Sequence, residues 1–190
     1  AEDTRTSGKL LKHYGIETPA TSFHAHNEHH KVEHFAKEMA RGISIALISD
    51  AGTPGISDPG FLLARECHNQ GIRVEALPGP TAFVPALVAS GLPCDKFYFE
   101  GFLPHKKGRQ TRIEFISSLP CTVVLYESPH RIIKTLGQLA EYYGPEHRAC
   151  VARELSKLHE EVRTGSLTEL KTHFETTSPK GEFVVVIGSK

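Results

Sequence analysis

Residues 43–60 read ISIALISDAGTPGISDPG, an apolar run that leads into a loop with three glycines and two prolines. The run 43–49 has the length and composition of a buried strand. Glycine lets a backbone adopt unusual dihedral angles and approach a ligand closely, whereas proline fixes the path of the chain. A loop with so little side-chain bulk predicts a ligand that main-chain groups recognise, although a tight turn that only joins a strand to a helix has the same composition.

Two further turns follow expected strands in the same way. LPGPTA (77–82) follows strand 72–77, and YESPHR (126–131) follows strand 121–127. In open α/β sheets, ligands bind beyond the carboxyl ends of the strands. A second loop rich in glycine and proline therefore favours a binding role over a simple turn. The glycine spacing matches neither GxGxxG nor the P-loop motif, which argues against both of these phosphate-binding loops.

Outward from these loops, strands and helices alternate along the chain. A first helix is expected after the opening residues of AEDTRTSGKLLKHYGI, and further helices at 28–41, 58–69, 81–90, 108–118, 129–142 and 167–175. Strands are expected at 43–49, 72–77, 96–102, 121–127, 148–154, 160–166 and 183–188. This alternation predicts an α/β fold with parallel or mixed sheets that are covered on both faces. We expect two lobes, an N-terminal lobe over 1–92 and a C-terminal lobe over 93–190, joined by GLPCD.

Composition narrows the classes of partner. The formal net charge is +0, so any anionic partner must be held by a local patch. No apolar stretch reaches the roughly 18 residues that span a bilayer, and no signal peptide is evident, so no membrane is expected. Four dispersed cysteines fit the reduced thiols of a cytoplasmic enzyme. His26, His30 and His34 share a helix face, but no cysteine or carboxylate completes a metal site, and no metal is expected.

Eight motifs occur along the chain in an order that resembles a known family. They are EDTRTSGKLLKHYGI (2–16), NEHHKVEHFAKEMARG (27–42), ISDAGTPGISDPG (48–60), LPGPTAFVPALVASGLP (77–93), FYFEGFLPHKKGRQTR (97–112), LYESPHRIIKTL (125–136), VARELSKLHEEVRTGSL (151–167) and KGEFVVVIG (180–188). With them the chain resembles the RsmI family of ribosomal RNA ribose 2′-O-methyltransferases, in the tetrapyrrole methylase superfamily. The resemblance covers essentially the whole chain.

The resemblance implies a two-lobed tetrapyrrole-methylase-like fold with S-adenosylmethionine (SAM) bound between the lobes. It also implies methylation of the ribose 2′-hydroxyl of a decoding-centre cytidine in 16S rRNA of the small ribosomal subunit. Members of the family begin with a strand and a glycine-containing loop that this chain lacks. We therefore expect the chain to be a fragment with its first strand missing.

The expected cofactor-binding residues lie in the two glycine-rich loops and in the second lobe. SAM carries a sulfonium, an amino group, a carboxylate, a ribose and adenine. Backbone amides and carbonyls can bind all of these groups without a metal. Carbonyl oxygens can also orient the methyl group through weak C–H···O contacts. The residues are Asp50, Ala51, Gly52, Thr53, Ile56 and Ser57 in the first loop, Thr81 and Ala82 in the second, then Tyr126, Glu154 and Glu182.

Catalysis calls for positioning and for a group that activates the hydroxyl. In-line transfer depends on alignment, and a general base or a polarising cation adds to the rate. Candidates come from EDTR (2–5), from Glu127 and His130 in YESPHR, and from ARE (152–154). We expect Glu2 and Asp3 to lie near the acceptor, with Arg5, Arg131 and Arg153 binding RNA phosphate or fixing those carboxylates. Each of them is as readily explained by a structural ion pair or a helix cap.

A neutral protein that binds RNA needs a basic patch, and PHKKGRQTR (104–112) is the candidate. The expected RNA-binding residues are Lys106, Lys107, Arg109, Arg112, Arg131 and Arg153. Such cations neutralise phosphates and make affinity fall with salt. A solvated basic loop has the same composition, and the aromatic residues of the adjoining FYFEGF are more typical of a strand core than of base stacking.

Two other functions remain open at this point. One is a methyltransferase of the same fold that acts on a tetrapyrrole, another small molecule or a protein residue, which needs an apolar acceptor cleft. The other is a non-catalytic RNA-binding or assembly factor. From the resemblance we expect a cytoplasmic homodimer whose partner is the small ribosomal subunit.

Overall fold

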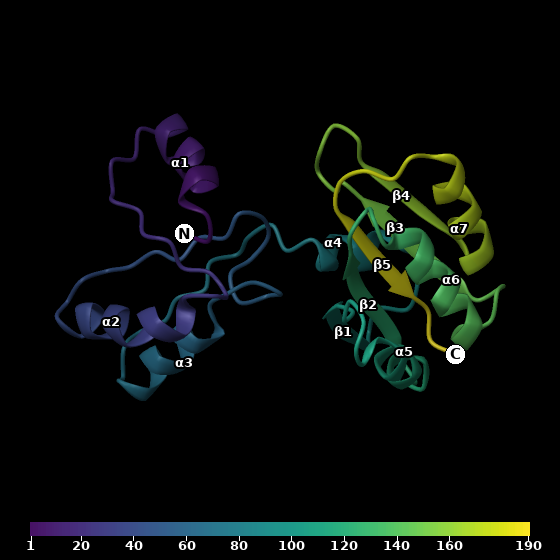
Figure 1. Ribbon diagram of the computed structural model, residues 1–190, viewed down its shortest axis with the longest axis horizontal. Helices are drawn as coiled ribbons and strands as arrows, with labels where there is room; N and C mark the ends of the chain where they lie inside the picture. The colour runs from purple at the N-terminus through teal and green to yellow at the C-terminus, as the bar shows by residue number, and fades with distance from the viewer. The chain divides into compact units, whose positions relative to one another are not determined.

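The chain forms two compact units, Ala1–Thr81 and Ala82–Lys190, in a computed structural model that describes all 190 residues (Figure 1). The division falls before the boundary expected near residue 92. The reason is helix α4 (Phe83–Ala89), whose residues Ala86 and Leu87 are buried in the same apolar cluster as strands of the second unit. Burial of that helix face ties α4 to the second unit.

The first unit contains three helices and no strand. The helices are α1 (Thr4–His13), α2 (Glu28–Ala40) and α3 (Phe61–Asn69). A small core of Phe23, Leu63 and Cys67 is extended by partly buried apolar side chains, namely Val32, Phe35 and Met39 of α2 together with Leu47 and Ile72. The first helix expected from the sequence is therefore confirmed as α1.

The strands expected at 43–49 and 72–77 are wrong, because neither segment is in the sheet of the structure. A strand exists only when its N–H and C=O groups pair with a neighbouring strand. Apart from bonds of Ile43 and Ile72 to the ends of the preceding helices, these segments have one main-chain hydrogen bond, from the Glu2 N–H to the Ile48 carbonyl at 3.2 Å. Without a paired neighbour, Ile43 stays 50% exposed and Leu77 76% exposed. The run 43–48 borders an apolar hollow of about 690 Å³.

The second unit is built on a mixed sheet of five strands in the order β1-β2-β5-β3-β4. Its strands are β1 (Phe97–Phe102), β2 (Thr122–Glu127), β3 (Arg148–Arg153), β4 (Glu161–Ser166) and β5 (Phe183–Ile187). Strands β1 and β2 are parallel, whereas β5 is antiparallel to both of its neighbours. The expected mixed sheet and all of its strands are thus confirmed.

Helices cover both faces of this sheet. Helices α5 (Arg109–Ser117), α6 (Ile132–Tyr143) and α7 (Leu167–Thr176) share one apolar cluster with one side of the strands. The opposite side packs on α4 in a smaller cluster. All five residues of β5 are buried, since this strand lies in the centre of the sheet. No helix of the structure has the length and apolar character that crossing a bilayer requires.

The carboxyl ends of β1, β2 and β3 meet at one edge of the sheet. Phe183, the first residue of β5, pairs with Glu127 on one side and with Arg153 on the other. The loops after β2 and β3 therefore lie next to the loop that leads into β5. This is the edge at which α/β sheets place their ligands.

A buried carboxylate at this edge ties the strands to the helices. The side chain of Glu127 is fully buried and accepts hydrogen bonds from the Ser128 N–H at 2.7 Å and from the Thr135 hydroxyl at 2.6 Å. Two guanidiniums approach it, that of Arg131 at 2.8 Å and that of Arg109 at 3.5 Å. Since removing one partner of a buried ion pair leaves an uncompensated charge, this network should be important for stability.

We expect Arg109→Met to destabilise the protein by about 3 kcal/mol, because Glu127 loses one of its two cations inside the core. The matched control is Lys107→Met, which changes an exposed neighbour and should shift the free energy of unfolding by less than about 0.5 kcal/mol. Both values come from chemical denaturation followed by circular dichroism. Equal stabilities of the two variants would contradict a structural role for Arg109.

Candidate functional site

The loop at 49–60 is held in a compact curl by its glycines. Gly52 and Gly55 adopt left-handed dihedral angles, with φ of 76° and 84°. Gly60 has a φ of 147°, and a Cβ on it would lie 3.0 Å from the Gly55 nitrogen and 3.1 Å from the Leu47 side chain. Only glycine fits at that point. The curl closes with a hydrogen bond from the Gly55 N–H to the Pro59 carbonyl, at 3.2 Å.

Three main-chain donors of the curl have no partner within the protein. The N–H groups of Ala51, Gly52 and Thr53 have no acceptor within the protein. Backbone polar groups normally pair with protein, water or ligand. Three consecutive unpaired donors on a rigid loop therefore fit a ligand with several polar ends, and a cofactor such as SAM has that chemistry.

The second loop meets the first. The hydroxyl oxygens of Thr53 and Thr81 are hydrogen-bonded at 2.5 Å. A Cβ on Gly79 would lie 3.9 Å from the Thr53 hydroxyl, and one on Gly52 would lie 3.9 Å from the Pro80 carbonyl. The structure thus brings together the expected cofactor-binding residues Asp50 to Ser57 and Thr81, which are far apart in the sequence. Ala82 is the next residue and begins the second unit.

The expected catalytic residues lie beside the first loop. The Asp50 N–H donates to the Glu2 carboxylate at 3.2 Å, and the Asp3 N–H donates to the Asp50 carboxylate at 3.1 Å. Three carboxylates, those of Glu2, Asp3 and Asp50, therefore gather where the chain enters α1. A separation of 47 residues between Asp3 and Asp50 hides this contact from the sequence.

Asp3 has a structural role in this group. It is the N-cap of α1, and its carboxylate accepts from the Arg5 N–H at 2.8 Å and from the Arg5 guanidinium at 2.6 Å. These hydrogen bonds lower the pKa of Asp3 to about 2. A carboxylate with so low a pKa is a weak base at neutral pH. Asp3 is better suited to orient Arg5, whose side chain is 89% exposed.

In the second unit, the expected cofactor residues lie at the ligand edge of the sheet. The half-buried ring of Tyr126 packs against Phe99 and Phe102, with centroids 5.2 and 5.6 Å apart. The Glu154 carboxylate accepts from the Glu182 N–H at 2.9 Å and from Lys157 at 3.0 Å. The bond from the Glu182 N–H is the main cause of the lowered pKa of Glu154.

Lys157 was missed by the sequence reasoning. Its ammonium bridges the carboxylates of Glu154 and Glu182, at 3.0 and 2.9 Å. Two non-glycine residues of this loop, Glu154 and Ser156, have left-handed φ values of 49° and 61°. The spacing of Glu154 and Lys157 was the only available signal. The contact with Glu182 depends on the pairing of β3 with β5.

Four of the six residues expected to bind RNA are engaged within the protein. Arg109 and Arg131 belong to the buried Glu127 network. Arg112 pairs with Glu100 at 2.5 Å and stacks on the Phe115 ring, and Arg153 lies 3.5 Å from Glu161. Their guanidiniums are already neutralised, so the basic patch inferred from 104–112 is much smaller than expected. Of the six residues expected to bind RNA, only Lys106 and Lys107 are exposed without an ion pair.

Other expected general-base candidates also have structural partners. Glu127 has two cations and two further donors around it, which leaves its oxygens occupied. Glu154 is held by Lys157 and the Glu182 N–H. His130 is exposed at the end of the loop after β2. Among the carboxylates considered, Glu2 has only one hydrogen bond from the protein to its side chain.

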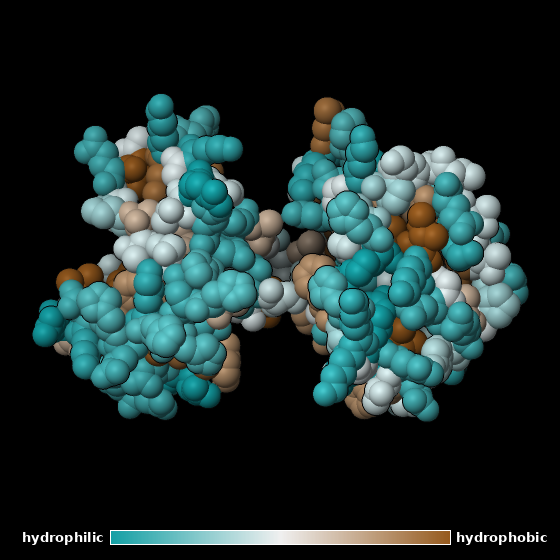
Figure 2. Space-filling view, viewed as in Figure 1, coloured by the Kyte–Doolittle hydropathy of each residue, from teal (hydrophilic) through white to brown (hydrophobic).

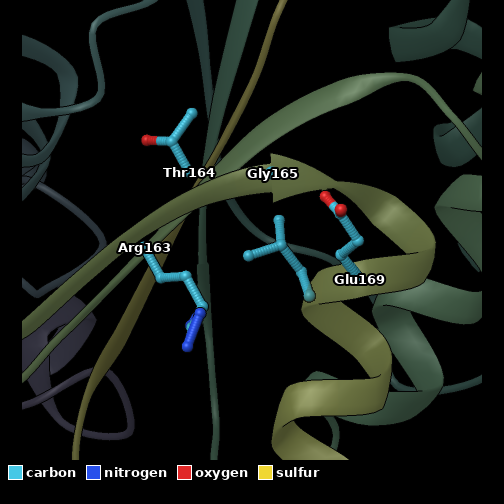
Figure 3. A pocket seen from close by; sticks show the side chains of 5 residues that line it. Arg163, Thr164, Gly165 and Glu169 are labelled. Atoms are coloured by element: carbon cyan, nitrogen blue, oxygen red, sulfur yellow. The ribbon is translucent and has the colours of Figure 1, made fainter.

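A small hollow of about 290 Å³ beside β4 lies outside this group of residues (Figure 3). Figure 3 shows the Glu169 side chain directed toward Gly165. Glu169 accepts from the Ser166 N–H at 2.8 Å and completes the capping box of α7. Its carboxylate therefore has a structural explanation.

Comparisons with known proteins show which family the chain is similar to. The family model for Tetrapyrrole (Corrin/Porphyrin) Methylases matches residues 2–171. Two curated relatives, both called ribosomal RNA small subunit methyltransferase I, come from Synechocystis and from Mesorhizobium japonicum. The first is 46% identical over 98% of this chain and 67% of its own length, and the second is 48% identical over 98% and 64%. The chain thus spans about two thirds of the length of these relatives.

A solved structure shows the same fold. It is the uroporphyrin-III C-methyl transferase of Thermus thermophilus complexed with S-adenyl homocysteine, which superposes with a TM-score of 0.54 at 18% identity over 83% of this chain and 72% of that one. The family model covers most of the chain, and the first relative is nearly half identical over two thirds of its own length. The chain therefore belongs to the tetrapyrrole methylase family, with the small subunit methyltransferase I proteins among its relatives.

Proposed function

We propose that the protein is a SAM-dependent methyltransferase that acts on the ribose 2′-hydroxyl of a decoding-centre cytidine in 16S rRNA. The observation that carries the proposal is the meeting of two glycine- and proline-rich loops at the Thr53–Thr81 hydrogen bond, with unpaired N–H groups beside it. Relatives named as ribosomal RNA small subunit methyltransferases support the RNA substrate. The 2′-oxygen and the cytidine rest on the resemblance of the sequence motifs.

The first unit would hold the cofactor mainly through main-chain groups. SAM, when bound, supplies an electrophilic methyl group on its sulfonium. The N–H groups of Ala51, Gly52 and Thr53 would donate to its polar ends, and the exposed carboxylate of Asp50 would attract its positive charges. Ile56, Ser57, Thr81 and Ala82 would complete this wall. Tyr126, Glu154 and Glu182 of the second unit are the proposed remaining contacts.

The carboxylate group at the start of α1 would serve the acceptor. Glu2 is the proposed general base, because it has one hydrogen bond from the protein and lies next to Asp50. Asp3 would position Arg5, whose exposed guanidinium can bind a phosphate of the substrate. Alignment of the hydroxyl would supply most of the acceleration, and proton removal by Glu2 a further factor of about 10² to 10⁴.

An enzyme with this substrate would work in the cytoplasm on the small ribosomal subunit. A homodimer also remains a prediction, and gel filtration of the full-length protein with light scattering checks it. A tetrapyrrole acceptor and a non-catalytic binding role are the outcomes that would replace the proposal.

Thr81→Val should weaken SAM binding about fivefold, because the isosteric change removes the hydrogen bond that joins the two loops, worth about 1 kcal/mol. Thr81→Ser keeps the hydroxyl and is the matched control. Isothermal titration calorimetry of SAM with full-length protein measures both. Unchanged affinity of the valine variant would show that the junction of the loops does not form the cofactor site.

The reaction is tested by transfer of a tritiated methyl group from SAM to small ribosomal subunits that lack the modification. Full-length protein should label a ribose 2′-oxygen of a cytidine in 16S rRNA. Label that maps to a base, or transfer to a tetrapyrrole alone, would overturn the proposed substrate. SAM binding with no methyl transfer to subunits, naked RNA or tetrapyrrole would overturn the proposal that the protein is a methyltransferase.

Two variants of Asp3 separate positioning from base catalysis in the same assay. Asp3→Asn keeps a good N-cap and an acceptor for Arg5, so activity should stay within about threefold of the parent. Asp3→Ala loses both and should be about tenfold slower, because Arg5 is no longer positioned. A loss of about 10² or more in both variants would instead identify Asp3 as the base.

A further inference from the structure

Helix α1 carries a concentration of positive charge with no acidic residue. Its sequence is TRTSGKLLKH, and Arg5, Lys9, Lys12 and His13 are all exposed. At 3.6 residues per turn these positions fall within an arc of about 100°. The four side chains therefore form one face, which we name the cationic face of α1.

The opposite side of α1 packs in part against the rest of the first unit. Ser7 is buried there and Leu11 is half-buried, whereas Leu10 and Tyr14 beside them are exposed. Figure 1 shows α1 standing apart from α2 and α3 within the unit, and in the region of α1 Figure 2 shows mostly hydrophilic side chains beside a hydrophobic patch. The cationic face is thus directed to solvent by the amphipathic pattern of the helix.

The basic residues of α1 and α2 differ in how many of them are paired with acidic side chains. On α2 and at its C-terminus, Lys37 pairs with Glu33 at 2.6 Å, and Arg41 pairs with Glu38 at 2.9 Å. On α1 the only ion pair is that of Arg5 with Asp3, and neither Lys9 nor Lys12 has an acidic partner. Like charges on one helix face repel each other. A polyanion bound along the face would relieve that repulsion.

The position of the face in the candidate site indicates which polyanion. Arg5 lies next to the carboxylates of Asp3 and Asp50, so the cationic face begins where the acceptor is expected to bind. Lys9 and Lys12 continue it by about 6 and 10 Å along the helix axis from Arg5. A nucleic-acid strand presents phosphates at regular intervals and would follow such a row.

We propose that the cationic face of α1 binds the phosphate backbone of the RNA next to the nucleotide that is modified. The proposal rests on the proposed function, because the acceptor nucleotide fixes where the RNA lies. It replaces the basic segment 104–112 as the main RNA contact, since the arginines of that segment are paired within the protein. The recognition is electrostatic and independent of base sequence.

The test compares Lys9→Gln/Lys12→Gln with Lys106→Gln/Lys107→Gln in full-length protein. Both double variants remove two exposed positive charges, and glutamine keeps the helix propensity of lysine. Binding of a 16S rRNA fragment is measured by filter binding between 50 and 200 mM salt. For the α1 variant we expect affinity to fall at least about tenfold at 50 mM salt, and the slope of log affinity against log salt to shrink by about 1.4 to 1.8. The control variant should keep a slope close to that of the parent.

Kinetics give a second readout. In the methyl-transfer assay, the α1 variant should have a KM for small subunits about tenfold higher than the parent, with kcat and SAM affinity unchanged. The reason is that Lys9 and Lys12 contact neither SAM nor the acceptor hydroxyl in the proposed complex. Circular dichroism confirms that both variants are folded.

The outcomes separate the two proposals. Parent protein that binds the RNA fragment through Lys9 and Lys12 but transfers no methyl group would overturn the proposed function and leave the RNA contact standing. An α1 variant with parental affinity and slope would overturn the RNA contact, whether or not methyl transfer occurs. So would a loss confined to Lys106→Gln/Lys107→Gln, or lysine-dependent binding to anionic vesicles with RNA binding unchanged.

Discussion

The hydrogen-bonded pairing of β5 with β2 and β3 is the interaction on which the second unit depends. β5 is the last strand of the chain, yet it lies in the centre of the sheet with all its residues buried. Because β5 pairs antiparallel with both β2 and β3, these two strands run in the same direction and their carboxyl ends lie at the same edge. For this reason Tyr126 at the end of β2 and Glu154 just after β3 both lie near the segment that leads into β5. The first unit has no such central strand, and its apolar segment 43–48 joins no sheet.

Charged side chains of the second unit also depend on partners that the fold brings close to them. Inside the second unit, arginines are matched to buried or half-buried acids, with Glu127 receiving two of them and Glu100 one. These pairs fix helices and strands to each other and leave little charge for a partner. In the first unit, the lysines of α1 have no acid nearby. Unmatched charge on a surface is a better guide to a polyanionic partner than the number of basic residues in a segment.

The two loops of the candidate site illustrate how little side chain is needed to build a binding wall. Gly60 permits the curl because a Cβ there would collide with Gly55. The curl leaves three N–H groups without an acceptor in the protein, and a hydrogen bond between the hydroxyls of Thr53 and Thr81 joins the neighbouring loop to it. Rigid donors of this kind bind a polar ligand without first losing side-chain entropy. The carboxylates of Glu2, Asp3 and Asp50 then add negative charge beside the wall.

Local patterns in the sequence determined all seven helices, the five strands of the sheet and the two loops. Those features depend on residues close in the chain, such as the apolar run 183–188 and the glycines of 49–60. Only the tertiary structure decided whether an apolar run became a strand, because strand formation requires a partner that may lie anywhere in the chain. It likewise decided that Arg109, Arg112 and Arg131 are structural, and that Asp3 meets Asp50. The free energy of a charge depends on its neighbours in space, and a linear sequence does not specify those neighbours.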